Sequence, residues 1–221
     1  MSIISQIQSI TSSLPDGVSL VAVSKTHSAE AIEVAYTTGQ RKFGESRPQE
    51  LKAKWEVLPR DIEWHMIGHL QTNKVKMVVP YVSLIESLDS LRLAEAINKE
   101  AAKCGKVVDC LLEIHVAQEE SKTGWNYEEL RSAISEGVFE RMPNIRLRGV
   151  MGIASNTYDD AVVRRDFETL KRYKDELVEI FGASFDTLSM GMSDDYPLAI
   201  ECGSTSIRVG SKIFGARDYS I

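Results

Sequence analysis

Cysteine is scarce in this chain of 221 residues, and its three copies follow no pattern. Cys104, Cys110 and Cys202 form no Cys-x-x-Cys pair, so the sequence offers neither a zinc site built on cysteine nor a disulfide framework. An odd number of unpatterned cysteines indicates reduced thiols and a cytoplasmic protein. We expect all three to be small buried side chains.

Long apolar runs, an excess of basic residues and nucleotide-binding loops are also missing. No stretch reaches the ~18 uncharged apolar residues of a membrane helix, and the N-terminal residues do not resemble a signal peptide. The net charge of −6, from 32 acidic and 26 basic residues, argues against a nucleic-acid partner. Neither a P-loop, a Gly-x-Ser-x-Gly elbow nor a glycine-rich dinucleotide fingerprint is present.

What the chain does contain is a regular alternation of short apolar runs and amphipathic segments. After a helix over residues 2–13, eight strands alternate with helices, which requires parallel pairing with right-handed crossovers. Eight such units predict a single (β/α)8 barrel over residues 1–221, with an open doubly wound sheet as the alternative. The predicted strands cover 20–25, 42–45, 62–67, 81–86, 107–116, 146–151, 185–190 and 207–209. We expect Ser28 to cap the helix after the first strand and Asp89 the helix after the fourth. Asp159 or Asp160 is expected to begin the longest helix, and Gly182 to end it.

Lys25 stands at the carboxyl end of the first predicted strand, where α/β sheets carry their chemistry. A half-shielded lysine there loses hydration, its pKa falls, and it becomes an amine nucleophile suited to a Schiff base with an aldehyde cofactor. The alternative is a lysine whose side chain only extends from the strand end into water.

Small and polar residues follow the last two predicted strands, at the end of a barrel that commonly binds phosphate. Residues 191–195 (GMSDD) join a strand to a short helix that Ser193 can cap, and Gly210-Ser211 adds further backbone N–H groups. The alternative is a capped helix and a tight turn without a ligand.

Arg208 lies inside an apolar strand, and a buried guanidinium needs a partner. That partner is either a glutamate from a strand end or a ligand. His65 and His69 are four residues apart but straddle a strand end and a glycine, so we expect packing or hydrogen bonding from them rather than metal binding.

Six blocks of the sequence resemble the pyridoxal phosphate homeostasis proteins, which have the barrel of the alanine racemases (fold type III). The blocks are residues 23–26 (VSKT), 40–45 (QRKFGE), 64–74 (WHMIGHLQTNK), 121–124 (SKTG), 188–195 (LSMGMSDD) and 208–217 (RVGSKIFGAR). The resemblance implies that Lys25 binds pyridoxal 5'-phosphate (PLP) as a Schiff base and that Arg208 faces the pyridine nitrogen. It also implies a phosphate cradle, formed by Ser193 with the backbone of Met192, Gly210 and Ser211. Ser46 and Arg47 depart from the family's usual Asn and Tyr.

The resemblance further implies a function with little or no catalysis. An arginine cannot give up its proton, so it keeps the pyridine nitrogen an unprotonated acceptor and makes the ring a weak electron sink. In the racemases a second base comes from a C-terminal β domain, which this sequence is expected to lack.

We therefore expect a monomeric PLP-binding protein of vitamin B6 and amino-acid homeostasis that holds PLP as a solvent-accessible Schiff base. It either passes PLP on, with apoenzymes as candidate recipients, or reports the PLP level. The first alternative is a small PLP-dependent racemase with an unidentified base, for which Tyr196 and His115 are candidates. The second is a barrel enzyme that forms a Schiff base with a sugar phosphate. Lys122 is a possible second aldehyde site.

Overall fold

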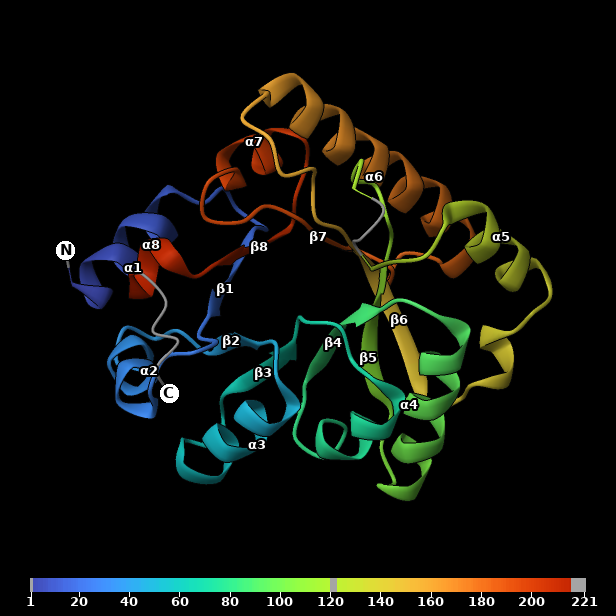
Figure 1. The fold of residues 1–221 in the computed structure, drawn as a ribbon, viewed down its shortest axis with the longest axis horizontal. Coiled ribbons are helices and arrows are strands. Elements are labelled where there is room, and N and C mark those ends of the chain that lie inside the picture. Colours follow the sequence, from blue (N-terminus) through green and yellow to red (C-terminus); the bar gives the residue numbers. More distant parts are fainter. Residues whose placement is uncertain (1, 120–122, 216–221) are drawn as a thin grey trace.

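The computed structural model describes residues 2–119 and 123–215. Its described part is a closed barrel of parallel strands in the order β1 to β8, surrounded by helices (Figure 1). The strands are β1 Ser19–Val23, β2 Lys42–Glu45, β3 Glu63–Met66, β4 Leu84–Leu88, β5 Val108–Glu113, β6 Ile145–Met151, β7 Thr187–Ser189 and β8 Ser206–Val209. The helices are α1 Ile3–Ser13, α2 Ala29–Tyr36, α3 Pro48–Val57, η1 Thr72–Met77, α4 Leu91–Lys103, α5 Tyr127–Ser135, η2 Phe139–Arg141, α6 Asp160–Phe181, α7 Tyr196–Glu201 and α8 Ser211–Phe214.

The barrel closes between its first and last strands. Ser19 of β1 pairs with Ser206 of β8, and the parallel register continues to Ala22 and Val209. The predicted (β/α)8 barrel, with an additional N-terminal helix, is confirmed. Because all strands are parallel, their carboxyl ends meet at one mouth, which therefore collects the segments that follow β1, β7 and β8.

Local signals in the sequence set several helix ends. The Ser28 hydroxyl accepts a hydrogen bond from the N–H group of Ala31 and so caps α2. Asp159 caps the longest helix, α6, in the same way, and Gly182 ends it with a φ of 82°. The predictions for Ser28 and Gly182 are confirmed, and of the two candidates Asp159 and Asp160 the cap is Asp159.

Two predicted boundaries around the fourth strand are wrong. β4 runs from Leu84 to Leu88 rather than over 81–86, so Glu86 lies in the middle of the strand and not at its end. The following helix is capped by Ser90, whose hydroxyl accepts from the N–H group of Leu93, and not by Asp89. Both errors have one cause: the apolar and polar residues of this stretch do not alternate strictly enough to fix the strand ends.

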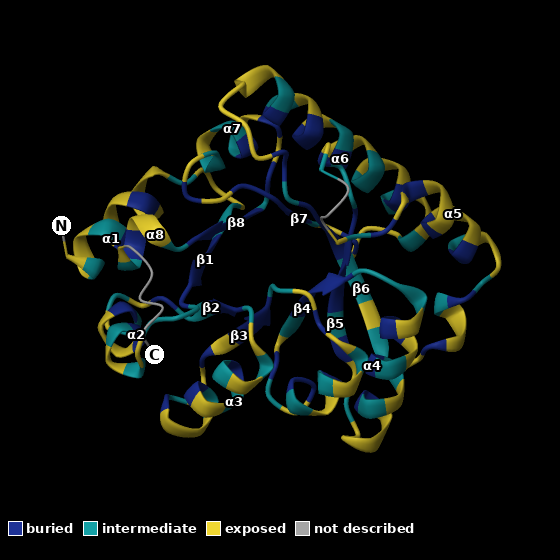
Figure 2. Ribbon diagram, viewed as in Figure 1, coloured by how far each residue is buried: buried dark blue, intermediate teal, exposed yellow. Residues whose placement is uncertain are grey.

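The core lies between the barrel strands and the inward faces of the helices, while the outer helix faces are exposed (Figure 2). In α6 the inward stripe includes Val163, Phe167, Leu170 and Leu177, all of them buried at helical spacing. The cysteine prediction is partly wrong: Cys110 and Cys202 are buried, but Cys104, at the end of α4, is exposed. No helix within the described ranges is long and apolar enough to cross a membrane.

Candidate functional site

A pocket opens at the carboxyl end of the barrel, formed by segments that follow several strands. Lys25 enters it after β1, and Arg208 reaches it from β8. All six residues that the sequence singled out for cofactor binding line this pocket, namely Lys25, Met192, Ser193, Arg208, Gly210 and Ser211. The other residues that line it are Val23, His27, Ser46, Ile67, Ile153 and Asp194. Residues from opposite ends of the chain therefore meet in one place.

The loops after β7 and β8 form a small polar cradle on one side of the pocket. The buried Ser193 hydroxyl accepts a hydrogen bond from the N–H group of Gly210 at 3.3 Å. A Cβ atom at Gly210 would lie 3.1 Å from the carbonyl oxygen of Val23, so the two backbones approach each other closely here. A hydroxyl and a backbone N–H group are donors that can hold an anion, and Ser193 and Gly210 bring one of each together here.

The prediction that Ser193 caps the short helix α7 is wrong. The N-cap position belongs to Asp195, whose carboxylate accepts a hydrogen bond from the N–H group of Met192 at 2.5 Å. Ser193 instead contacts Gly210, which lies 17 residues further along the chain. The serine hydroxyl thus joins the two loops of the cradle.

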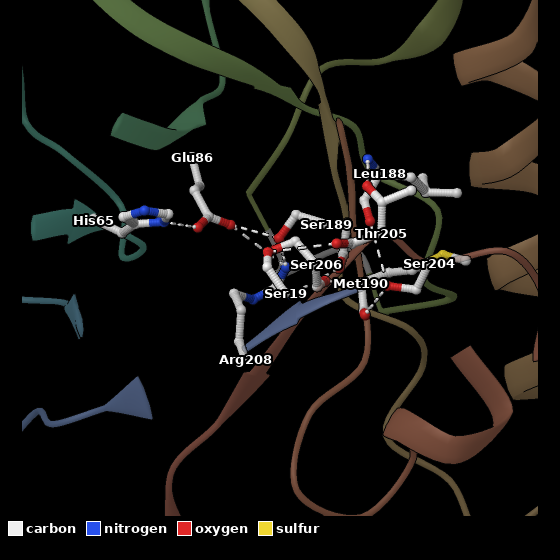
Figure 3. A network of polar contacts seen from close by, with 11 residues as sticks. Ser19, His65, Glu86, Leu188, Ser189, Met190, Ser204, Thr205, Ser206 and Arg208 are labelled. Carbon is white, nitrogen blue, oxygen red and sulfur yellow. Dashed lines mark hydrogen bonds and ion pairs between the residues drawn. The ribbon is translucent and has the colours of Figure 1, made fainter. Parts of the chain in front are cut away.

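Arg208 is buried at the centre of a polar network inside the barrel (Figure 3). Its guanidinium donates to the Ser189 hydroxyl at 2.6 Å and to the carbonyl oxygen of Gly152 at 2.9 Å. It also lies 3.7 Å from a carboxylate oxygen of Glu86. The sequence left open whether Arg208 meets a glutamate or a ligand. In the structure it pairs with a glutamate, Glu86, and its side chain also lines the pocket.

Glu86 completes this network from β4. One of its oxygens accepts from Ser189 at 2.5 Å, and the other lies 2.7 Å from Nδ1 of His65 (Figure 3). Burial on its own would raise the pKa of Glu86, but the hydrogen bond from His65 and the charges of His65 and Arg208 outweigh it and hold that pKa below its usual value. Glu86 is thus an ionised group that balances the charge of Arg208.

The two histidines considered at the sequence level form hydrogen bonds to carboxylates. His65 contacts Glu86, and His69 lies 2.7 Å from Asp89. Across residues 2–119 and 123–215 no cluster of three or more histidine, cysteine or acidic side chains is arranged to hold a metal ion.

Sequence reasoning missed a second network, which contacts the residues on both sides of Lys25. Lys54 of α3 is only 6 % exposed, and its ammonium lies 2.7 Å from carboxylate oxygens of both Glu45 and Glu50. Burial raises the pKa of Glu45 to about 7, although the charge of Lys54 opposes this shift. A lysine on a helix normally reaches solvent, so only the tertiary arrangement reveals this cluster.

The two positions that depart from the family pattern face different surroundings. Ser46 lines the pocket with Lys25, whereas Arg47 is exposed at the start of α3 and borders a separate groove beside Thr26 and His27. Lys122, considered as a second aldehyde site, lies outside the described residues.

Comparison with known proteins places the chain in a family. The model of the alanine racemase N-terminal domain matches residues 2–218. The pyridoxal phosphate homeostasis protein of Pasteurella multocida is 38 % identical over 207 residues, which cover 92 % of this chain and 88 % of that protein. The protein of the same name from Aquifex aeolicus is 42 % identical over 201 residues, which cover 90 % and 87 %. The chain belongs to the pyridoxal phosphate homeostasis protein family.

Solved structures agree with this assignment. PipY of Synechococcus elongatus, determined without PLP, superposes on this chain with a TM-score of 0.91 at 38 % identity. The match covers 97 % of this chain and 100 % of the PipY chain. PipY with PLP bound gives a TM-score of 0.89 at 37 % identity. An alanine racemase of Clostridium difficile shares the fold, with a TM-score of 0.76 at 14 % identity. The match covers 58 % of the racemase chain.

Proposed function

We propose that this member of the family binds PLP in the pocket at the barrel mouth and serves vitamin B6 and amino-acid homeostasis with little or no turnover. The observation that carries the proposal is that Lys25 shares one pocket with the Ser193–Gly210 cradle and with Arg208. Homologues named pyridoxal phosphate homeostasis protein and the PLP-bound PipY structure support it.

The residues present fit PLP. The cofactor carries an aldehyde, a phosphate and a pyridine nitrogen, and the pocket offers an amine, an anion cradle and a guanidinium for these three groups. Glycine suits the cradle, because a Cβ at position 210 would lie only 3.1 Å from the carbonyl oxygen of Val23. Ser193, with the backbone of Met192, Gly210 and Ser211, would hold the phosphate, and Lys25 would form a solvent-accessible Schiff base with the aldehyde.

Arg208 decides how much chemistry such a site supports. PLP, when bound, supplies a ring that can withdraw electrons from an attached amino acid. The guanidinium keeps its proton, so a ring nitrogen that faces it stays an acceptor and the ring withdraws electrons weakly. Glu86 helps to keep the guanidinium of Arg208 charged and in this position, because a carboxylate oxygen of Glu86 lies 3.7 Å from a nitrogen of Arg208. The pocket therefore favours holding PLP over using it.

The racemase alternative requires a second base across the pocket from Lys25. Tyr196 and His115, the candidates from the sequence, are both absent from the described residues that line this pocket. His115 lines a separate cavity with Glu113, and Tyr196 begins α7. This arrangement supports binding and release of PLP rather than racemisation.

We further propose that residues 1–221 form a single PLP-binding domain that acts as a monomer in the cytoplasm and delivers PLP to recipient apoenzymes. The closed barrel supports the monomer, because its strands leave no open sheet edge that a partner would need to cover.

The test is to incubate the PLP-loaded protein with L-alanine in deuterated water and, separately, with excess apoenzyme of a PLP-dependent transaminase. We expect no deuterium at the α-carbon by NMR, and recovery of transaminase activity as PLP is passed on. Incorporation of α-deuterium that depends on Lys25 would instead establish the racemase reading.

A further inference from the structure

The connection that carries Lys25 has an unusual backbone. It leads from the end of β1 to Ser28, the N-cap of α2. Thr26, directly after Lys25, has a φ of 65° and is the only non-glycine residue with positive φ in the described ranges. A β-branched residue rarely adopts this conformation, and such strain persists only where the surroundings impose it. Elsewhere in these ranges the backbone uses glycine for positive φ.

Two side chains of α3 hold this connection. Glu50 accepts a hydrogen bond from the N–H group of Thr26 at 2.6 Å. Lys54 donates to the carbonyl oxygen of Ser24 at 2.8 Å. These are the peptide groups on either side of the Lys25 Cα atom, so α3 fixes the backbone both before and after the lysine.

The pair that does this is charged, with Lys54 buried and Glu50 partly exposed. The Lys54 ammonium also donates to Glu45 and Glu50, each at 2.7 Å, so its three protons meet three acceptors. Charge-assisted hydrogen bonds between buried groups are short and strong, and a buried ammonium that lost them would be costly. Through Lys54 and Glu50 this network is bonded to the peptide groups on both sides of Lys25.

Closure of the barrel does not depend on these contacts. The ladder between β1 and β2 pairs Ala22 with Phe43 and Val23 with Gly44, and the ladder to β8 ends at Ala22. Both end before Lys25. The contacts of α3 with Ser24 and Thr26 thus act on the segment that projects into the pocket, while the contact with Glu45 joins Lys54 to the end of β2.

We propose that Glu50 and Lys54 are positioning residues for Lys25, which set the direction in which its side chain enters the pocket toward the Ser193–Gly210 cradle. The proposal rests on the function proposed above, because the benefit lies in presenting an amine to the aldehyde of a cofactor whose phosphate is held elsewhere. If the hydrogen bond between Glu50 and the N–H group of Thr26 is lost, the backbone next to Lys25 is less constrained. The amine of Lys25 then spends less time oriented toward the aldehyde of the cofactor.

The test compares three substitutions of Glu50 with a control on the same helix. Glu50→Ala removes the contact, and Glu50→Asp keeps the charge but shortens the reach. Glu50→Gln loses the charge but keeps an oxygen that accepts from Thr26. The control is Glu56→Ala, which breaks the exposed pair between Glu56 and Lys52 on α3. For each protein, stopped-flow absorbance gives the rate and affinity of Schiff-base formation with PLP. Borohydride trapping with peptide mapping gives the share of label on Lys25, and circular dichroism checks the fold.

We expect Glu50→Ala and Glu50→Asp to bind PLP about tenfold more weakly, the equivalent of one lost charge-assisted hydrogen bond, with a smaller share of label on Lys25. Glu50→Gln should recover most of the rate, and Glu56→Ala should match the wild type. If Glu50→Ala does not fold, Glu50→Asp decides, because it keeps the charge balance around Lys54.

Two results would overturn the proposal in different ways. Equal rates and equal labelling of Lys25 in Glu50→Asp and Glu56→Ala would refute the positioning role and leave the proposed function standing. A wild-type protein that forms no Schiff base at Lys25 would overturn the proposed function and, with it, the positioning role.

Discussion

Replacement of Arg208 by methionine tests whether the charges inside the barrel depend on one another. The substitution keeps an unbranched side chain but removes the donors to Ser189 and Gly152 and the positive charge 3.7 Å from Glu86. Glu86 is fully buried, so its carboxylate would keep hydrogen bonds to His65 and Ser189 but lose the permanent positive charge beside it. Breaking a buried ion pair on one side costs about 3 to 5 kcal/mol, and we expect Arg208→Met to lower the free energy of unfolding by that amount at neutral pH.

The pH dependence gives the sign of the effect. A carboxyl whose pKa is lowered by folding stabilises the protein above its unfolded value, and that contribution is lost as pH falls through the folded pKa. In Arg208→Met one cause of the lowered pKa of Glu86 is gone, so Glu86 takes up a proton more readily. The deficit in stability of the variant should therefore shrink as the pH falls toward the ordinary carboxyl pKa of 4.5.

The assay is urea unfolding of the cofactor-free protein, as a double-mutant cycle with Glu86→Gln. Because the double variant leaves no unpaired buried charge, we expect it to be more stable than the sum of the single losses by about 2 kcal/mol. Strictly additive losses, or a loss in Arg208→Met that does not change with pH, would refute the coupling between Arg208 and Glu86.

Two further predictions concern residues close to the pocket. Burial raises the pKa of Glu45 from 4.5 to about 7, so between these pH values the folded state binds a proton that the unfolded state does not. The free energy of unfolding should therefore fall by up to about 3 kcal/mol as the pH rises from 4.5 to 7. Measured by urea unfolding, this fall with pH should be smaller in Glu45→Gln, and an equal fall in the variant would contradict the raised pKa of Glu45. Gly191 has a φ of 94°, and a Cβ there would lie 2.6 Å from that of Ala199. Gly191→Ala should therefore lower the melting temperature and, by displacing Ser193, weaken PLP binding. A variant that melts and binds PLP like the wild type would show that the backbone at this position accommodates a side chain.

Local chemistry explains which parts of the fold the sequence could predict. The presence and order of the strands, the caps at Ser28 and Asp159 and the stop at Gly182 depend on neighbours within a few residues, and the sequence pattern indicated them, although strands such as β1 and β5 end two or three residues earlier than predicted. Eight alternating units then leave few topologies, so the barrel and the meeting of Lys25 with Gly210 followed.

Contacts between distant segments explain what the sequence could not predict. Ser193 had a local role available as a helix cap, but a partner 17 residues away, Gly210, takes its hydroxyl instead. Nothing in the sequence marks Lys54, since a lysine on a helix ordinarily reaches solvent, and its burial depends on where α3 packs against the end of β1. Glu86 was misplaced by a shift of the strand, which hid its position opposite Arg208.

The most direct test of the proposed function is the absorption spectrum of the protein with PLP, recorded for the wild type and for Lys25→Ala, followed by borohydride reduction and peptide mapping. We predict a Schiff-base band in the wild type that disappears on reduction, a covalent label on the peptide with Lys25, and neither signal in the variant. A band of equal strength in Lys25→Ala, or no band in the wild type with excess PLP, would contradict the assignment of this pocket as the PLP site.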